Sequence, residues 1–167
     1  DIVTLGPSNA ASEVFGMAPG VQAGYVDVGG AYHACLWRGT SQSFVDFNGP
    51  ESGSRFLGTT GRIHVGDGAG PGVGVEHALV NLGRPDAWLD LHQFLPTVFS
   101  SFSRAYAVYQ DGPTIFVVGE ALNPQTNYEA ILWSGPDLCY PNCDQSTAPP
   151  TLNVLDFICF LNQFAAG

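Results

Sequence analysis

The sequence predicts an all-β protein with three four-stranded antiparallel repeats and a C-terminal calcium-loop-plus-helix appendage. Residues 33–39 (HACLWRG) recur at 77–83 (HALVNLG) and at 129–135 (EAILWSG), at spacings of 44 and 52 residues, which indicates an array of similar units. The apolar segments around this stretch are short and have no helical period. The 21 Gly and 12 Pro of the 167-residue chain fall between these segments, as expected for turns between strands.

Composition excludes several classes of partner. Hydrophobic residues make up 45% of the chain and charged residues 12%, which is typical of a packed protein rather than a disordered one. Five basic residues against 15 acidic ones give a net charge of −10. We therefore expect no nucleic-acid partner, because phosphate binding needs basic patches. No apolar run reaches the ~20 residues of a membrane span.

The repeats divide residues 1–135 into units 1–45, 46–89 and 90–135. Each unit opens on an Asp-bearing strand, at 1–5, 44–47 and 88–91. A serine follows, then an apolar strand that ends in glycine, and then the His-Ala or Glu-Ala strand. The serines are Ser12, Ser54 and Ser103, and the glycine-ending strands are 21–24, 63–66 and 116–119. With the segment that begins at the serine counted as a strand, each unit supplies four strands.

Repeated units of four antiparallel strands predict propeller-like blades, with a β-trefoil or a β-prism as the alternative. Three units are fewer than a propeller usually needs to close. No Asp-bearing strand follows Gly135, yet a lone strand of that type opens the chain at residues 1–5. We predict that residues 2–5 pair either with the last unit of the same chain, closing a ring, or with the same unit of a neighbouring copy.

Three stretches in order carry a family resemblance: residues 1–6 (DIVTLG), 22–24 (QAG) and 33–37 (HACLW). Over residues 1–135 the chain resembles extracellular β-propeller repeats with a His-Ala-Phe signature. The resemblance implies a propeller-type fold outside the cell. Two positions depart from the pattern, because Asn81 replaces the Trp in the second unit and Glu129 replaces the His in the third.

The appendage, residues 136–167, has its own pattern. Apolar residues recur at helical spacing over residues 154–164, which predicts a helix. Oxygen-bearing residues before and into this helix follow calcium-loop spacing, with a three-residue insertion and Thr147 in place of the usual glycine. The predicted calcium ligands are Asn142, Asp144, Ser146, the Thr151 carbonyl, Asn153 and Asp156. The alternative is an Asx-rich turn that caps the helix, with Asn153 as N-cap.

Cysteine placement suggests how the appendage is held. Cys143 and Cys159 flank the loop and helix, and a bridge between them closes a loop of about 15 residues, worth roughly 3 kcal/mol. Cys139 is then left to reach Cys35 in the first unit or to stay free. One or two bridges suit an exported protein.

Residues 139–147, 152–154, 156–157 and 159–167 together resemble the GC-type dockerin-like anchoring module of exported planctomycete proteins. Dockerins carry two loop–helix units, whereas this chain has one. The resemblance, which spans residues 137–167, implies calcium binding and attachment to a cohesin-like or other extracellular protein.

No motif predicts catalysis. The chain has no nucleophile elbow, no zinc-protease motif, no P-loop and no dinucleotide fingerprint. His33 and His77 share one repeat position and are interpreted as packed strand histidines, and Asp46 and Asp90 as turn residues. The Gly-rich stretch 66–72 has no Lys and is interpreted as a loop rather than a phosphate cradle.

We therefore expect a non-enzymatic structural or adhesive protein, extracellular or on the cell surface. It self-assembles, or is anchored by its dockerin-like segment, into a fibre or surface layer, and its partners are further copies or an extracellular protein. The second hypothesis is a glycan-binding propeller module tethered by that segment. The third is a fragment of an extracellular hydrolase. We expect Asp1 to begin a processed mature chain or a fragment, because it lies inside a patterned segment.

Overall fold

The computed structural model describes residues 2–47, 53–69, 75–85, 87–99 and 101–136. The chain divides into two compact units, Asp1–Gly135 and Pro136–Gly167. The predicted loop and helix of the appendage lie outside the described residues, with all six predicted calcium ligands and with Cys139, Cys143 and Cys159.

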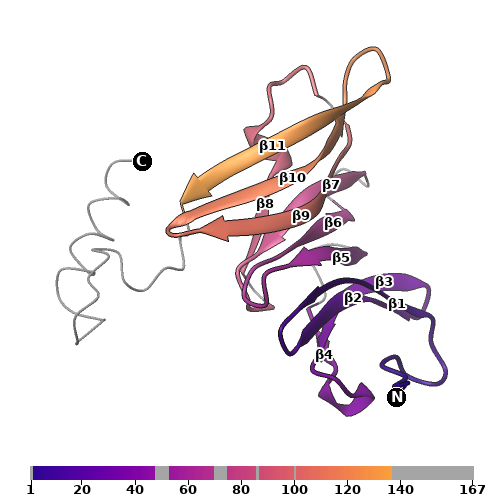
Figure 1. The fold of residues 1–167 in the computed structure, drawn as a ribbon. Coiled ribbons are helices and arrows are strands. Elements are labelled where there is room, and N and C mark those ends of the chain that lie inside the picture. The colour runs from indigo at the N-terminus through magenta and orange to yellow at the C-terminus, as the bar shows by residue number, and fades with distance from the viewer. Residues whose placement is uncertain (1, 48–52, 70–74, 86, 100, 137–167) are drawn as a thin grey trace, which may run out of the picture. The chain divides into compact units, whose positions relative to one another are not determined.

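The first unit consists of three antiparallel sheets (Figure 1). The first sheet has β1 (Ser12–Ala18), β2 (Val21–Val28), β3 (Ala31–Trp37) and β4 (Val45–Asp46). The second has β5 (Ser54–Thr59), β6 (His64–Ala69), β7 (Glu76–Asn81) and β8 (Trp88–Asp90). The third has β9 (Ser103–Asp111), β10 (Thr114–Leu122) and β11 (Tyr128–Pro136). The all-β antiparallel class is confirmed, but the third sheet has three strands where four were predicted.

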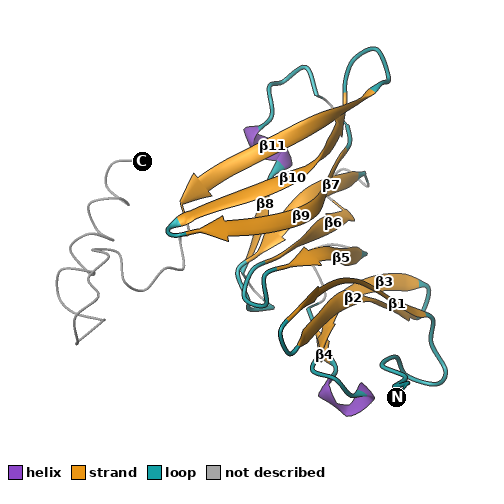
Figure 2. Ribbon diagram, viewed as in Figure 1, coloured by secondary structure: helices purple, strands orange, loops and turns teal. Residues whose placement is uncertain are grey.

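Helical structure among the described residues is limited to two short 3₁₀ turns, η1 (Ser41–Ser43) and η2 (His92–Phe94) (Figure 2). The first turn, η1, lies between β3 and β4, and the second, η2, lies between β8 and β9. Within the described ranges, no helix has the length and hydropathy to cross a membrane.

The sheets are offset by one strand from the sequence repeats. Asp46 in β4 lies opposite Cys35 in β3, and Asp90 in β8 lies opposite Leu79 in β7. The Asp-bearing segment that opens the second or third sequence unit therefore completes the sheet of the preceding unit. The third sheet ends at β11 because no such segment follows it within the described residues.

The glycine predicted to end an apolar strand in each unit lies inside β2, β6 or β10 instead, and its recurrence has a steric cause. A Cβ on Gly24, Gly66 or Gly119 would fall 1.8–1.9 Å from a backbone carbonyl oxygen of the adjacent first strand. Each of these contacts lies beside a β-bulge, at the same place in all three sheets. Only glycine permits this approach, so the repeated glycine marks a repeated bulge.

The sheets pack face to face, and a repeated serine links each one to the sheet before it. Ser54 Oγ in the second sheet accepts the Ala34 amide of the first at 3.1 Å. Ser103 Oγ in the third sheet accepts the Ala78 amide of the second at 2.9 Å. One apolar core lies between the first and second sheets, around Phe47 and Phe56, and another lies between the second and third.

Residues 2–5 form no strand in the described chain. Ile2 and Val3 are exposed, and Leu5 packs against the face of the first sheet that carries Cys35 and Trp37. The predicted closure of a ring within one chain is therefore wrong. The reason is geometric, because the second sheet lies between the first and third (Figure 1) and β11 is out of reach. Pairing with a neighbouring copy stays a prediction.

His64 should make folding sensitive to acid. The side chain is buried beside Phe47 and Phe56, with Nδ1 2.8 Å from Thr59 Oγ1. Burial, with a smaller effect of the Arg38 charge, lowers the His64 pKa from 6.5 to about 4. Because the unfolded state binds the proton more tightly, stability is complete above pH 6.5. It falls by roughly 3 kcal/mol as the pH drops towards 4.

Urea unfolding at pH 7 and pH 4.5 measures this loss. His64→Asn, which can keep the bond to Thr59, should show a smaller decrease in unfolding free energy between these pH values than the wild type. An equal decrease in both proteins contradicts the assignment to His64.

Candidate functional site

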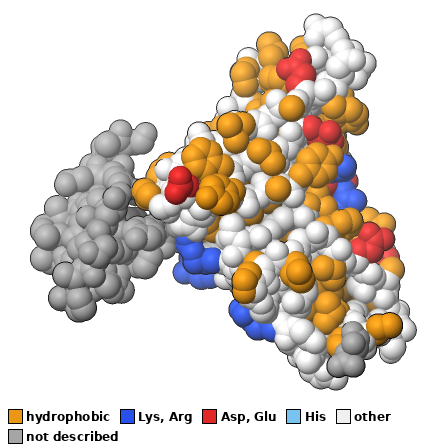
Figure 3. Space-filling view, in the orientation of Figure 1, with side chains coloured by type: hydrophobic (Ala, Val, Ile, Leu, Met, Phe, Trp, Pro, Cys, Tyr) orange, Lys and Arg blue, Asp and Glu red, His pale blue; other side chains and the backbone are white. Residues whose placement is uncertain are grey.

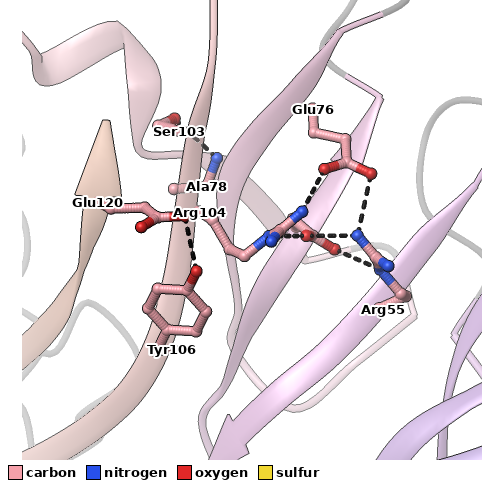
Figure 4. A network of polar contacts seen from close by, with 8 residues as sticks. Arg55, Glu76, Ala78, Ser103, Arg104, Tyr106 and Glu120 are labelled. Carbon is pink, nitrogen blue, oxygen red and sulfur yellow. Dashed lines mark hydrogen bonds and ion pairs between the residues drawn. The ribbon is translucent and has the colours of Figure 1, made fainter. Parts of the chain in front are cut away.

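A network of four charged side chains joins the second and third sheets (Figure 4). Asp67 in β6 is 1% exposed and accepts Arg55 Nε on Oδ1 at 2.9 Å and Arg55 Nη2 on Oδ2 at 2.8 Å. Arg104, from β9 of the third sheet, donates to Asp67 Oδ2 and to Glu76. Glu76 in β7 also accepts Arg55 Nη2 at 2.9 Å.

The network is charge-balanced and links the second sheet to the third. Two guanidinium groups face two carboxylates, and the bonds to Asp67 raise the pKa of Arg55. Both Asp67 oxygens accept hydrogen bonds from arginine donors. The Asp67 side chain is also closed to solvent.

Sequence reasoning missed this network. The stretch 66–72 was predicted to be a loop, but residues 66–69 belong to β6, and Asp67 is buried there. The prediction was wrong because glycine was taken as a sign of flexibility, whereas Gly66 and Gly68 have backbone or side-chain atoms against them. The available signal was position, since Arg55 and Arg104 each follow the repeated serine.

Two His–Asp pairs connect third and fourth strands. His33 Nδ1 lies 2.9 Å from Asp46 Oδ2, and His77 Nδ1 lies 2.8 Å from Asp90 Oδ2. Asp90 Oδ1 also accepts the His92 amide at 2.8 Å, as expected of a turn residue. These pairs hold β4 and β8 on the edges of their sheets.

A serine–histidine contact occurs between the second and third sheets but is not a nucleophilic site. His92 Nε2 donates to the Phe99 carbonyl oxygen at 3.1 Å, which assigns the ring proton to Nε2. His92 Nδ1 then accepts from Ser103 Oγ at 2.9 Å, while Ser103 Oγ accepts the Ala78 amide. Burial and the neighbouring His77 lower the His92 pKa. Ser103 is fully buried, so no substrate reaches its hydroxyl.

The third sheet has an apolar face on which no other sheet of the described residues packs. Leu132 is 64% exposed, whereas the residues at its repeat position, Leu36 and Val80, are 6% and 4% exposed. Val118 is 47% exposed, whereas its counterparts Ala23 and Val65 are completely buried. Ala130 is exposed, while Ala34 and Ala78 are buried. We call the surface formed by Val118, Ala130 and Leu132 the open face.

The alternation of side chains along the strands shows that the open face lies on the side of the third sheet away from the second sheet. Val117, Ile131 and Trp133 pack towards the second sheet, so their neighbours in the chain point to the opposite side. Figure 3 shows hydrophobic side chains gathered over the third sheet. Exposed tyrosines in the same sheet are Tyr106, Tyr109 and Tyr128. An exposed apolar patch of this kind marks a site of interaction.

Trp37 and Trp133 are buried, as expected of core residues. Cys35 is a buried free thiol, and burial raises its pKa. Within the described ranges, no three His, Cys, Asp or Glu side chains gather to hold a metal ion, and the predicted calcium loop lies outside those ranges.

Comparisons of the chain with protein-family models, curated proteins and solved structures each found no match.

Proposed function

We propose that this chain is an exported structural or adhesive protein that self-assembles into an extracellular fibre or surface layer. The open face supports this proposal. Repeat positions that are buried at two interfaces within the chain are exposed in the third sheet. A surface already shaped to receive a further sheet of the same kind favours association between copies. The appended segment, residues 136–167, serves as a second attachment point.

The finer fold that we propose is a short stack of propeller-type blades. Each sheet is a meander of consecutive strands, and each packs by its face on the next. Both features suit propeller blades better than a β-trefoil or β-prism. Within the described residues no fourth strand pairs with β11, and we propose that its outer edge pairs with a segment from another chain.

Light scattering at several protein concentrations tests self-assembly. We expect the molar mass to exceed the 17.7 kDa of one chain and to rise with concentration. Leu132→Glu should remain monomeric, because association would bury an unpaired charge. Val98→Glu is the matched control, since Val98 is also an exposed apolar residue but lies outside the open face. A wild-type chain that is monomeric throughout contradicts the proposal.

Calcium binding by the appended segment stays a prediction with its own test. Extracellular calcium modules bind in the range of about 0.1–1 mM, so ~10 mM calcium should raise the melting temperature of this segment. Asp144→Ala removes one of the two predicted charged ligands and should abolish the rise. The absence of any calcium-dependent shift in the wild type contradicts the metal site and favours a capped turn.

Glycan binding is the second candidate, because Tyr106, Tyr109 and Tyr128 expose their rings on the third sheet. Exposed rings can stack on sugars. A glycan array separates the two functions: a monomer that binds a defined glycan supports this candidate, and an assembling protein without glycan binding supports the first.

A further inference from the structure

Ile2 is the most exposed large apolar residue among the described residues. The two residues at its repeat position follow the Asp of β4 and β8. They are Phe47 and Leu91, which are 4% and 6% exposed in the two cores between sheets. Ile2 is fully exposed. The sequence thus places a core-type residue where the single chain has no core for it.

The backbone at this repeat position also has a defined partner. Phe47 N donates to the Ala34 carbonyl oxygen and Leu91 N donates to the Ala78 carbonyl oxygen, each at 2.8 Å. The equivalent acceptor in the third sheet is the carbonyl oxygen of Ala130, on the outer edge of β11. That edge has no fourth strand within the described residues.

Trp37 gives a second, independent indication. Its Nε1 is buried and has no hydrogen-bond partner among the described residues. The tryptophan at the same repeat position, Trp133, donates Nε1 to the Leu91 carbonyl oxygen at 3.1 Å. Ile2 is at the repeat position of Leu91, so its carbonyl oxygen is the acceptor that corresponds to Trp37 Nε1. A buried donor without an acceptor is unfavourable. Placing the Ile2 carbonyl oxygen beside Trp37 Nε1 would supply the acceptor.

The first sheet carries the surface that matches the open face. Ser12 and Val14 occupy the repeat positions of Ser54 and Phe56, which pack on the preceding sheet. Val14 is exposed in the chain, whereas Phe56 is buried. The segment before Ser12 lies over this surface, since a Cβ on Gly6 would fall 1.8 Å from Ser12 Oγ. Docking of another sheet therefore requires this segment to move.

Chain connectivity permits that move. The Asp of a fourth strand precedes the serine of the next sheet by 8 residues from Asp46 to Ser54 and by 13 from Asp90 to Ser103. The interval from Asp1 to Ser12 is 11 residues, which lies between the two. A linker of this length can thus span from a fourth strand to the first strand of the following sheet.

We propose that copies of this chain join head to tail, with the first sheet of one copy stacked on the open face of the next. Ile2 of the first copy then takes the place beside β11 of its partner that Phe47 and Leu91 take beside β3 and β7. Ser12 Oγ accepts the Ala130 amide, Ile2 N donates to the Ala130 carbonyl oxygen, and Trp37 Nε1 donates to the Ile2 carbonyl oxygen. The contact repeats the interface between sheets, and it rests on the proposed self-assembly.

Mixing two blocked variants tests the head-to-tail contact. Val14→Glu blocks the first sheet and Leu132→Glu blocks the open face, so each should be monomeric alone. An equimolar mixture should give a heterodimer of twice 17.7 kDa and nothing larger, because one intact surface of each kind remains. If the wild type assembles but either variant assembles alone, or the mixture stays monomeric, the arrangement is overturned while self-assembly stands. A monomeric wild type overturns both.

A pair of proline variants tests the contact that Ile2 makes. Ile2→Pro removes the N–H that should bond to β11 and should weaken association about tenfold. Thr4→Pro is the matched control, because it leaves the N–H groups of residues 2 and 3 in place. Both residues are exposed in the single chain, so neither change should alter its melting temperature. Equal association by the wild type and Ile2→Pro overturns the bond from Ile2 to β11.

Discussion

Gly66→Ala is expected to lower the free energy of unfolding by about 3 kcal/mol or more, because the added methyl group overlaps backbone. The new Cβ would lie 1.8 Å from the Arg55 carbonyl oxygen and 2.8 Å from its carbonyl carbon. Neither atom can rotate away, so β5 and β6 must separate at the bulge. Thermal and urea unfolding measure the loss.

Gly135→Ala is the matched control, since a Cβ there meets nothing within 4 Å. It should change the unfolding free energy by less than about 1 kcal/mol. A Gly66→Ala variant as stable as Gly135→Ala contradicts the steric origin of the repeated glycine.

Asp67→Asn is expected to lower the free energy of unfolding by about 3 kcal/mol. It leaves Arg55 and Arg104 paired only with Glu76, and removal of one partner of a buried ion pair is strongly unfavourable. The two arginine side chains are about a quarter exposed, which keeps the loss at the lower end of the range for buried pairs. Urea unfolding at pH 7 gives the value.

Glu76→Gln is the control within the same network. Glu76 is 43% exposed and bonds to the same two arginines, yet solvent screening should limit its loss to about 1 kcal/mol. If the two variants lose equal stability, burial of Asp67 does not determine the strength of the network.

Position within the repeat determined how much of the fold could be predicted. The apolar strands around Gly24, Gly66 and Gly119 and the buried Trp37 could be recognised because each recurs in another unit. The strand predicted at residues 1–5 matched a recurring segment as well, but residues 2–5 form no strand. The serines could be aligned in the same way. Their bonds to Ala34 and Ala78 could not be predicted, because these join different units across an interface that no local pattern describes.

Three other features could not be predicted from a local sequence pattern. Asp67 lies in a glycine-rich stretch that looks flexible, and its burial depends on Arg104, 37 residues away. Closure of a ring by residues 2–5 depends on the number of sheets and their twist rather than on the strand itself. Exposure of Leu132 likewise follows from the end of the stack, since the same residue type is buried at position 36.

Amide hydrogen exchange at Ala130, measured with residue resolution in dilute and in assembled protein, tests the continuation of the stack most directly. In the assembly, the Ala130 amide should become protected like those of Ala34 and Ala78, which are bound to Ser54 and Ser103. Exchange at Ala130 that is as fast in the assembled protein as in the monomer contradicts the account.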